Sequence, residues 1–322
     1  MRPFALSTRR NAEGVALLTV LGILALLTVM GLATVSYVAH QTDEARLRLD
    51  TLRAEHIAQG GLQAAIALIE ERLAAEEGRH GEAWEDAVSI PVYVVDGGGE
   101  PAAASHVWGE AVFTVEDELG RVNLNFAPPD LLERLGFSPE DAAAVAEYVR
   151  PGGNGARWLS SVDGVVTAAG LDPGAAGALE TGWFTVYSAP PGAPPGAYLN
   201  VNTLPTDVLA AVLDVSAEQA DEAAARRPFQ NARALAYAAG KRPEAFLLAP
   251  PEGEPEGTAE ALAFRSRTYR VAVEGRLVEE GDGVEEDEGG QRTRLVRRVS
   301  AVVHFPVDGP PEILRAWPGG AP

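Results

Sequence analysis

The sequence contains no cysteine, which excludes disulfides, thiolate metal sites and cysteine nucleophiles. Histidine is scarce, and none of the five residues (His40, His56, His80, His106 and His304) has the paired spacing of a zinc-binding helix. Phosphate-binding glycine loops and the GxSxG nucleophile motif are missing as well. We therefore expect a protein without catalytic residues, metal ligands or a cofactor.

Positive charge is also in short supply, with 26 Lys and Arg against 46 Asp and Glu and a formal net charge of −20. Such an acidic body repels phosphate backbones, which argues against nucleic acid as a partner. The run Glu279–Glu288 is a weak candidate for calcium, because hard cations prefer clustered carboxylates. It lacks the EF-hand spacing, so a solvated hairpin loop is the expected interpretation.

Charge is entirely absent from the 25 residues Val15–Ala39. As a helix this stretch would extend about 37 Å, enough to cross a bilayer core. Arg9 and Arg10 precede it, whereas residues 40–44 behind it contain no Lys or Arg, so the N-terminus should face the cytoplasm. The sequence predicts a single-pass inner-membrane protein whose body lies in the periplasm.

The polar-to-apolar junction at Glu13-Gly14-Val15 precedes this long apolar run, unlike the cleavage site of a secretory signal peptide. A short basic leader, a Gly and then an unbroken apolar helix resemble the type IV prepilin class. That resemblance implies that prepilin peptidase cuts between Gly14 and Val15, and that Val15 becomes N-methylated. Two positions depart from the usual pattern. Glu13 stands where a basic residue is common, and Thr19 occupies the fifth mature position, where most members carry Glu.

The body begins with helical periodicity over residues 41–77, which predicts an amphipathic helix that Gly60-Gly61 should soften midway. Ile90–Val95 and Trp108–Val115 have strand composition. The next strands are expected only at residues 269–274 and Leu295–Phe305. These segments predict an antiparallel sheet interrupted by a long insertion.

The insertion contains an internal repeat. Asn123–Leu132 aligns with Asn200–Leu209 at five identical positions of ten, and Ser138 then matches Ser216 after one gap. The Asn pairs suit turns, the prolines suit helix starts, and the serines are predicted N-caps of a second helix. Each copy is therefore expected to be a turn followed by a short helical hairpin.

The predicted fold class is α+β, with an N-terminal transmembrane and amphipathic helix packed on an antiparallel pilin-like sheet that holds a mostly helical inserted domain. The expected segments are a leader (1–14), a transmembrane helix (15–39), an amphipathic helix with the first strands (40–117), the inserted domain (118–260), the last strands (261–309) and a flexible tail (310–322).

An interrupted pilin-like sheet, a duplicated LNxNxxPxDxL segment and Thr19 in place of Glu together resemble the K-type minor pseudopilins of type II secretion. That resemblance implies a subunit at the tip of the periplasmic pseudopilus, which helps to start its assembly. Its expected partners are minor pseudopilins I and J and the other pseudopilins. A minor pilin of a type IV pilus is an alternative. Less favoured is a membrane-anchored DNA-uptake receptor, suggested by Gly-containing hairpin turns at Leu135-Gly136 and Asp163-Gly164. The second copy has Leu213-Asp214 at the place equivalent to Leu135-Gly136, and a carboxylate there argues against phosphate binding.

Overall fold

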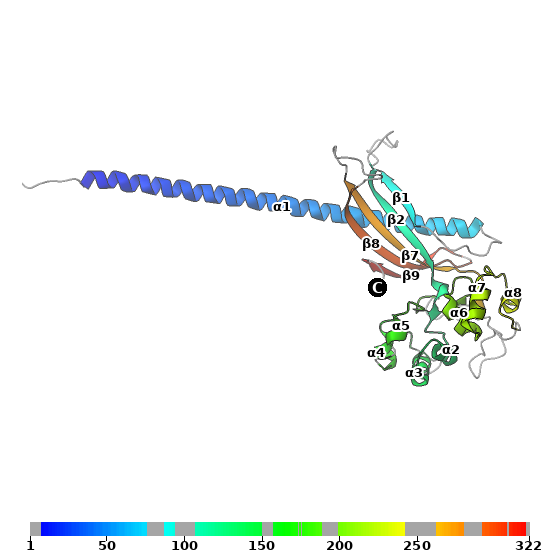
Figure 1. Ribbon diagram of the computed structural model, residues 1–322. Coiled ribbons are helices and arrows are strands. Elements are labelled where there is room, and N and C mark those ends of the chain that lie inside the picture. The colour runs from blue at the N-terminus through cyan, green and yellow to red at the C-terminus, as the bar shows by residue number, and fades with distance from the viewer. Residues whose placement is uncertain are drawn as a thin grey trace, which may run out of the picture. The chain divides into compact units, whose positions relative to one another are not determined.

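The protein combines one long N-terminal helix, an antiparallel sheet and a group of short helices (Figure 1). The computed structural model describes residues 8–75, 87–93, 107–149, 157–172, 174, 176–188, 199–241, 262–279, 292–307 and 309–319. Two compact units divide the chain, Met1–Arg53 and Ala54–Pro322.

The first unit consists of the N-terminal part of helix α1 (Thr8–Ala75). Its apolar stretch from Val15 onward has a mean hydropathy of 2.6 and none of it is buried, so this helix is long and apolar enough to cross a membrane. Thr19, Thr28 and Thr34 each donate a hydrogen bond of 2.7–2.8 Å to the carbonyl four residues earlier. All three threonines of the apolar stretch therefore have a hydrogen-bonded hydroxyl group, which keeps the surface of the helix compatible with hydrocarbon.

The second unit contains a five-stranded antiparallel sheet in the order β1-β2-β7-β8-β9. Its strands are β1 (Val88–Tyr93), β2 (Val107–Asp117), β7 (Thr268–Glu279), β8 (Arg292–His304) and β9 (Glu312–Pro318). The four strands that the sequence predicts are confirmed. The central pair β2 and β7 is joined through about 150 residues of chain, as the interrupted pattern required.

One face of the sheet is covered by the C-terminal part of α1. Ala54, Ile57 and Ile69 of the helix are buried in one apolar cluster with Phe113 of β2 and Val273 of β7, which we name the sheet core. The opposite face carries a ladder of ion pairs across β2, β7 and β8. Arg276 lies 3.1 Å from Glu110 and 2.8 Å from Glu274, and Arg298 lies 2.8 Å from Glu274. One buried face and one charged face are what a half-solvated antiparallel sheet needs.

The glycine pair of α1 does not soften the helix, contrary to the sequence prediction. The helix continues unbroken through Gly60 and Gly61. A Cβ on Gly61 would overlap the side chains of Ala111 and Val273, and one on Gly275 would overlap the backbone of Ala54 and Ala58. These glycines therefore let helix and sheet approach closely, and this packing outweighs the low helix propensity of Gly.

The C-terminal segment is not a flexible tail, so the prediction for residues 310–322 is wrong over most of its length. Strand β9 pairs with β8 from Glu312 to Pro318, and the amide of Gly319 donates to the carbonyl of Arg298 at 2.8 Å. The ring of Trp317 lies edge-on to that of Tyr187, with 5.3 Å between centroids. Flanking Pro and Gly suggested fraying, but strand pairing and one aromatic contact hold the segment.

Between β2 and β7 the chain forms short helices with an apolar core of their own, which we name the insert core. The elements are η1 (Glu118–Gly120), β3 (Val122–Asn123), α2 (Pro129–Arg134), α3 (Pro139–Val149), α4 (Val165–Ala169), α5 (Ala176–Leu179), β4 (Phe184–Thr185), β5 (Leu199–Asn200), α6 (Thr206–Leu213), α7 (Ala217–Ala224), α8 (Ala232–Ala238) and β6 (Leu262–Ala263). The predicted end at residue 260 falls short, because β6 pairs with β5.

The internal repeat extends well beyond the residues that reveal it in the sequence. Each copy starts with a short strand and a helical hairpin, and continues through α4 and α5 in the first copy and α8 in the second. Each ends in a short strand that pairs in parallel with the first one: β3 with β4, and β5 with β6. Ser138 and Ser216 both accept a hydrogen bond from the amide three residues on, which confirms them as N-caps. The two copies are therefore one module used twice.

The module is closed by an asparagine that the sequence suggested only as a turn residue. Asn125 accepts a bond from the amide of Leu159 at 2.8 Å and donates to the carbonyls of Leu159 and Val186. Asn202 repeats this arrangement with the amide and carbonyl of Phe229 and the carbonyl of Phe264. Each side chain thus joins three segments of chain, and we name the pair the asparagine clamps.

Candidate functional site

The sheet and the inserted helices meet at a polar network where β2 ends. Asp117 and Glu118 are adjacent in sequence but bind different partners. Asp117 accepts hydrogen bonds from Asn200 and Thr203, both at 2.6 Å, and from the amide of Leu119 at 2.8 Å. Burial raises the pKa of the Asp117 carboxyl, and these hydrogen bonds oppose that shift. This carboxylate holds the second repeat.

Glu118 holds the first repeat and the sheet. Its carboxylate is fully buried and receives two hydrogen bonds of 3.0 Å from the guanidinium of Arg270 on β7. The hydroxyl of Thr185 on β4 donates to the same carboxylate. A bidentate Arg–carboxylate pair fixes the direction of both side chains as well as their separation. The joint between the sheet and the inserted helices is therefore held by directional contacts.

The C-terminal strand contributes to this joint. The guanidinium carbon of Arg270 lies 5.8 Å from the centroid of the Trp317 ring, within the range of a cation–π contact. Tyr187, which stacks edge-on with Trp317, donates its hydroxyl to the carbonyl of Ser160 in the first repeat at 2.6 Å. We name Asp117, Glu118, Arg270 and Trp317, with their partners, the junction network. It joins β2, β7, β9 and both repeats.

Sequence analysis did not identify the junction network. Glu118 and Arg270 are separated by 152 positions, and nothing local distinguishes a buried carboxylate from an exposed one. The only available signal was indirect: an Asp-Glu pair stands where a predicted strand ends and a predicted helical segment begins. Such a place must satisfy the polar backbone groups of the junction, and side chains often supply the partners.

The predicted processing site lies near the N-terminus, far in sequence from the junction network. Gly14 and Val15 are part of α1, which begins at Thr8, and Thr19 is one turn further along. The hydroxyl of Thr19 is bonded to the carbonyl of Val15 at 2.8 Å. Cleavage between Gly14 and Val15 stays a prediction.

In the ranges that the structure describes, no group of three or more His, Asp or Glu side chains is placed to hold a metal ion. Most of the acidic run Glu279–Glu288, the weak calcium candidate, lies outside the described residues.

The hairpin turns that suggested DNA binding differ between the repeats. Gly136 has a φ of 100°, whereas Asp214 occupies the equivalent place with a φ of 51°. Lys241 donates to the carbonyls of Leu213 and Asp214, at 2.6 and 2.5 Å. The second turn therefore presents a carboxylate, and its nearby lysine is engaged by the end of α6, which does not suit a phosphate.

Comparison with solved structures identifies a protein of similar fold. No protein-family model matches the sequence, and no curated protein matches it either. Among solved structures, the chain is similar to one chain of the crystal structure of the GspK-GspI-GspJ complex from the type 2 secretion system of enterotoxigenic Escherichia coli. The TM-score is 0.54 at 14% sequence identity, over 86% of this chain and 100% of the other. The protein therefore has the fold of one chain of the GspK-GspI-GspJ complex, with a long apolar helix and an antiparallel sheet accompanied by further helices.

Proposed function

We propose that this protein is a minor pseudopilin of a type II secretion system, a non-enzymatic subunit that caps the tip of the periplasmic pseudopilus and helps to start its assembly. The fold it shares with a chain of a pseudopilin complex is the single observation that carries the proposal. The apolar stretch of α1 supports a single span of the inner membrane, with the N-terminus cytoplasmic and the body periplasmic. This role requires neither a cofactor nor nucleic acid.

The residue at position 19 supports a place at the tip. In the prepilin class, the usual Glu at the fifth mature position pairs with the N-terminal amine of a neighbouring subunit. A subunit with no neighbour above it would leave such a carboxylate unpaired in hydrocarbon, at a cost of about 3 kcal/mol or more. Thr19 avoids this cost because its hydroxyl bonds to its own helix.

The inserted helices support the same placement. They form a second apolar core beside the sheet core, so the body is much larger than a sheet and its helix alone. A repeating shaft subunit must leave room for copies above and below it, whereas a terminal subunit is free on one side. The junction network then matters because it fixes the orientation of the inserted helices relative to the sheet.

Processing at the N-terminus is the first test. With prepilin peptidase present, the mature chain should begin at Val15, and intact-mass analysis of membrane-extracted protein measures this directly. Gly14→Leu should block cleavage and leave a chain that begins at Met1, because a peptidase takes its substrate extended and the added side chain would clash. Gly22→Leu is the matched control, since nothing lies within 4 Å of a Cβ at that position. A wild-type chain still beginning at Met1 would contradict membership of the prepilin class.

Partner choice tests the secretion role itself. Co-expressed with minor pseudopilins I and J of a type II system, the detergent-solubilised full chain should purify as a stable complex of all three. The minor pilins of a type IV pilus are the control partners, and the same chain should not co-purify with them. Retention by type IV pilins in place of I and J would reassign the protein to a pilus.

A further inference from the structure

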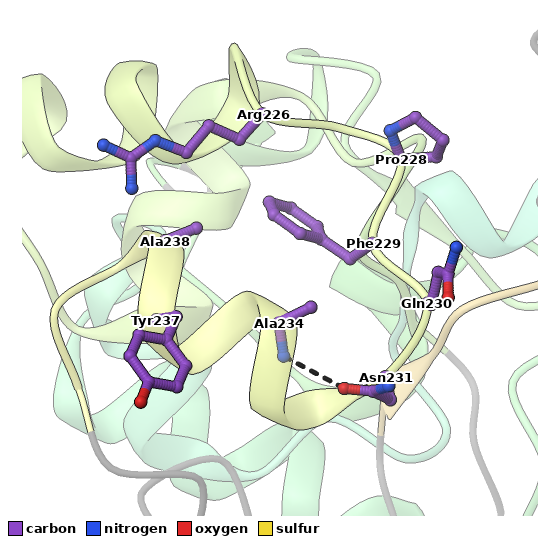
Figure 2. A pocket seen from close by; sticks show the side chains of 8 residues that line it. All are labelled: Arg226, Pro228, Phe229, Gln230, Asn231, Ala234, Tyr237 and Ala238. Carbon is purple, nitrogen blue, oxygen red and sulfur yellow. Dashed lines mark hydrogen bonds between the residues drawn. The ribbon is translucent and has the colours of Figure 1, made fainter.

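A hollow of about 250 Å³ opens on the second repeat, lined by α8 and by the segment that joins α7 to α8 (Figure 2). Its floor is the buried ring of Phe229, which in Figure 2 points into the middle of the hollow. Arg226, Ala234 and Tyr237 stand around it. Tyr237 is 81% exposed, which is unusual for a large aromatic side chain outside a membrane segment. Exposed tyrosine and arginine around a small apolar floor are typical of protein interfaces.

The first repeat serves as an internal reference for these residues. The side chains of Ser161, in the turn before α4, and of Asn231, at the N-cap of α8, each accept a hydrogen bond from the amide three residues on. Gly170 ends α4 with a φ of 68°, as Gly240 follows α8 with a φ of 65°. Counting from these matched ends aligns Asp163 with Arg233 and Thr167 with Tyr237. The first repeat folds the same module with an acidic and a small residue at these two exposed positions. The aromatic and cationic side chains of the second repeat are therefore not required by the module.

The hollow is also an exception in charge. From Ala223 to Pro243 the chain has five Lys and Arg and no Asp or Glu, within a protein of net charge −20. Two of these cations serve the fold: Lys241 bonds to the end of α6, and Arg227 donates to the carbonyl of Leu204 at 2.8 Å. Arg226 lines the hollow, and Arg233 precedes its lining residue Ala234 on α8. Both arginines are exposed, and within the described part of the chain neither forms an ion pair.

We propose that this hollow is a docking surface for an acidic peptide segment of a partner protein, with one apolar side chain of the segment seated over Phe229 and its carboxylates beside Arg226 and Arg233. The hollow is too small for a typical organic cofactor, which needs about 300–1,000 Å³, but it accommodates a single side chain. The surrounding acidic body disfavours a long polyanion such as nucleic acid, whereas a short acidic segment meets only the local cations. This site does not depend on the secretion role.

The test compares peptide binding by the full-length protein in detergent, measured by fluorescence anisotropy. The probe is the fluorescein-labelled hexapeptide Glu-Asp-Pro-Phe-Glu-Asp, with Lys-Lys-Pro-Phe-Lys-Lys as the charge-inverted control. The variant Arg233→Asp/Tyr237→Thr installs the residues that the first repeat carries, so it should fold. We expect it to bind the acidic peptide about tenfold more weakly, because it loses both a cation and the aromatic wall. Arg134→Asp, the same charge change on α2, should bind as the wild type does.

Salt distinguishes charge pairing from simple apolar adsorption. Raising the salt concentration from about 50 to about 300 mM should weaken binding of the acidic peptide severalfold, because the exposed cations become screened. Equal affinity for the charge-inverted peptide, or unchanged binding by the double variant with its cooperative unfolding intact, would overturn the proposal. Tighter binding of a labelled single-stranded oligonucleotide than of the acidic peptide would overturn it as well. Failure of both the processing test and the partner test above would leave this comparison unaffected.

Discussion

Replacing Arg270 with alanine is expected to lower the free energy of unfolding of the body by about 3–5 kcal/mol, because the change leaves a buried carboxylate without its cation. The side chain of Glu118 has no exposed surface, and that of Arg270 is only 16% exposed. Water cannot replace the guanidinium at such a site. The remaining hydroxyl of Thr185 supplies one donor where three were present.

Chemical denaturation of the full chain in detergent, followed by tryptophan fluorescence, measures this loss. Trp317 lies against Arg270, so the same change should also alter its emission before global unfolding begins. The matched control is Arg121→Ala, which breaks a pair with Glu116 that is 58% exposed on the carboxylate side. An exposed pair of this kind contributes about 0–1 kcal/mol.

A second change separates lost packing from buried charge. In the Arg270→Ala background, Glu118→Gln removes the uncompensated charge while keeping the shape of the side chain. We therefore expect the double variant to be more stable than Arg270→Ala alone by about 1–3 kcal/mol. Equal losses for Arg270→Ala and Arg121→Ala would mean that the junction network does not hold the body together.

The contrast between α1 and the junction network shows what the sequence can predict. The apolar stretch from Val15 is an unbroken local pattern, and a helix satisfies its own backbone, so the sequence alone determined this element. The Glu118–Arg270 pair joins residues 152 positions apart and depends on how the insertion folds back. Burial of a charge is a tertiary property, and neither periodicity nor composition reports it.

The glycines and the last strand show how local signals fail. Gly61 has a poor helix propensity, yet its position against Ala111 and Val273 makes the absent side chain an advantage. Around β9, proline and glycine suggested fraying, but six of the seven residues of this strand pair with β8. In each case a contact with a distant segment overrode the local preference, and a single sequence contains no record of that contact.

The repeat lies between these extremes. Ten aligned residues were enough to predict a duplicated hairpin, because turn, cap and helix-start residues recur at fixed spacing. The full module was not predictable, since Leu159 and Phe229 receive the asparagine clamps without sharing any local motif. Each clamp replaces strand pairing with side-chain bonds at a place where three segments converge. That arrangement explains how such short strands remain ordered.

The second large loss of stability is expected when an asparagine clamp is removed. We expect Asn125→Ala to lower the free energy of unfolding by about 3 kcal/mol or more, because it leaves the buried amide and carbonyl of Leu159 and the carbonyl of Val186 without their partner. The side chain of Asn125 is only 7% exposed, and Leu159 and Val186 are 2% and 1% exposed, so water cannot reach these groups without opening the insert core.

Two further variants make this test specific to the clamp. Asn125→Asp keeps the acceptor for the amide of Leu159 but directs a second oxygen at two carbonyls, so it should destabilise at least as strongly as alanine above the ordinary pKa of Asp, about 3.9. Asn231→Ala removes only the exposed N-cap of α8 and should cost about 1 kcal/mol.

The equivalent change Asn202→Ala should reproduce the loss in the second repeat, though to a smaller extent, because Asn202 is only half-buried. Thermal and urea unfolding of the four variants rank these effects. If Asn125→Ala and Asn231→Ala were equally mild, the clamp would be a consequence of the fold and not one of its supports. If instead both clamp variants unfold the inserted helices while the sheet core persists, the duplicated module is an autonomous unit, and the junction network is what couples it to the rest of the body.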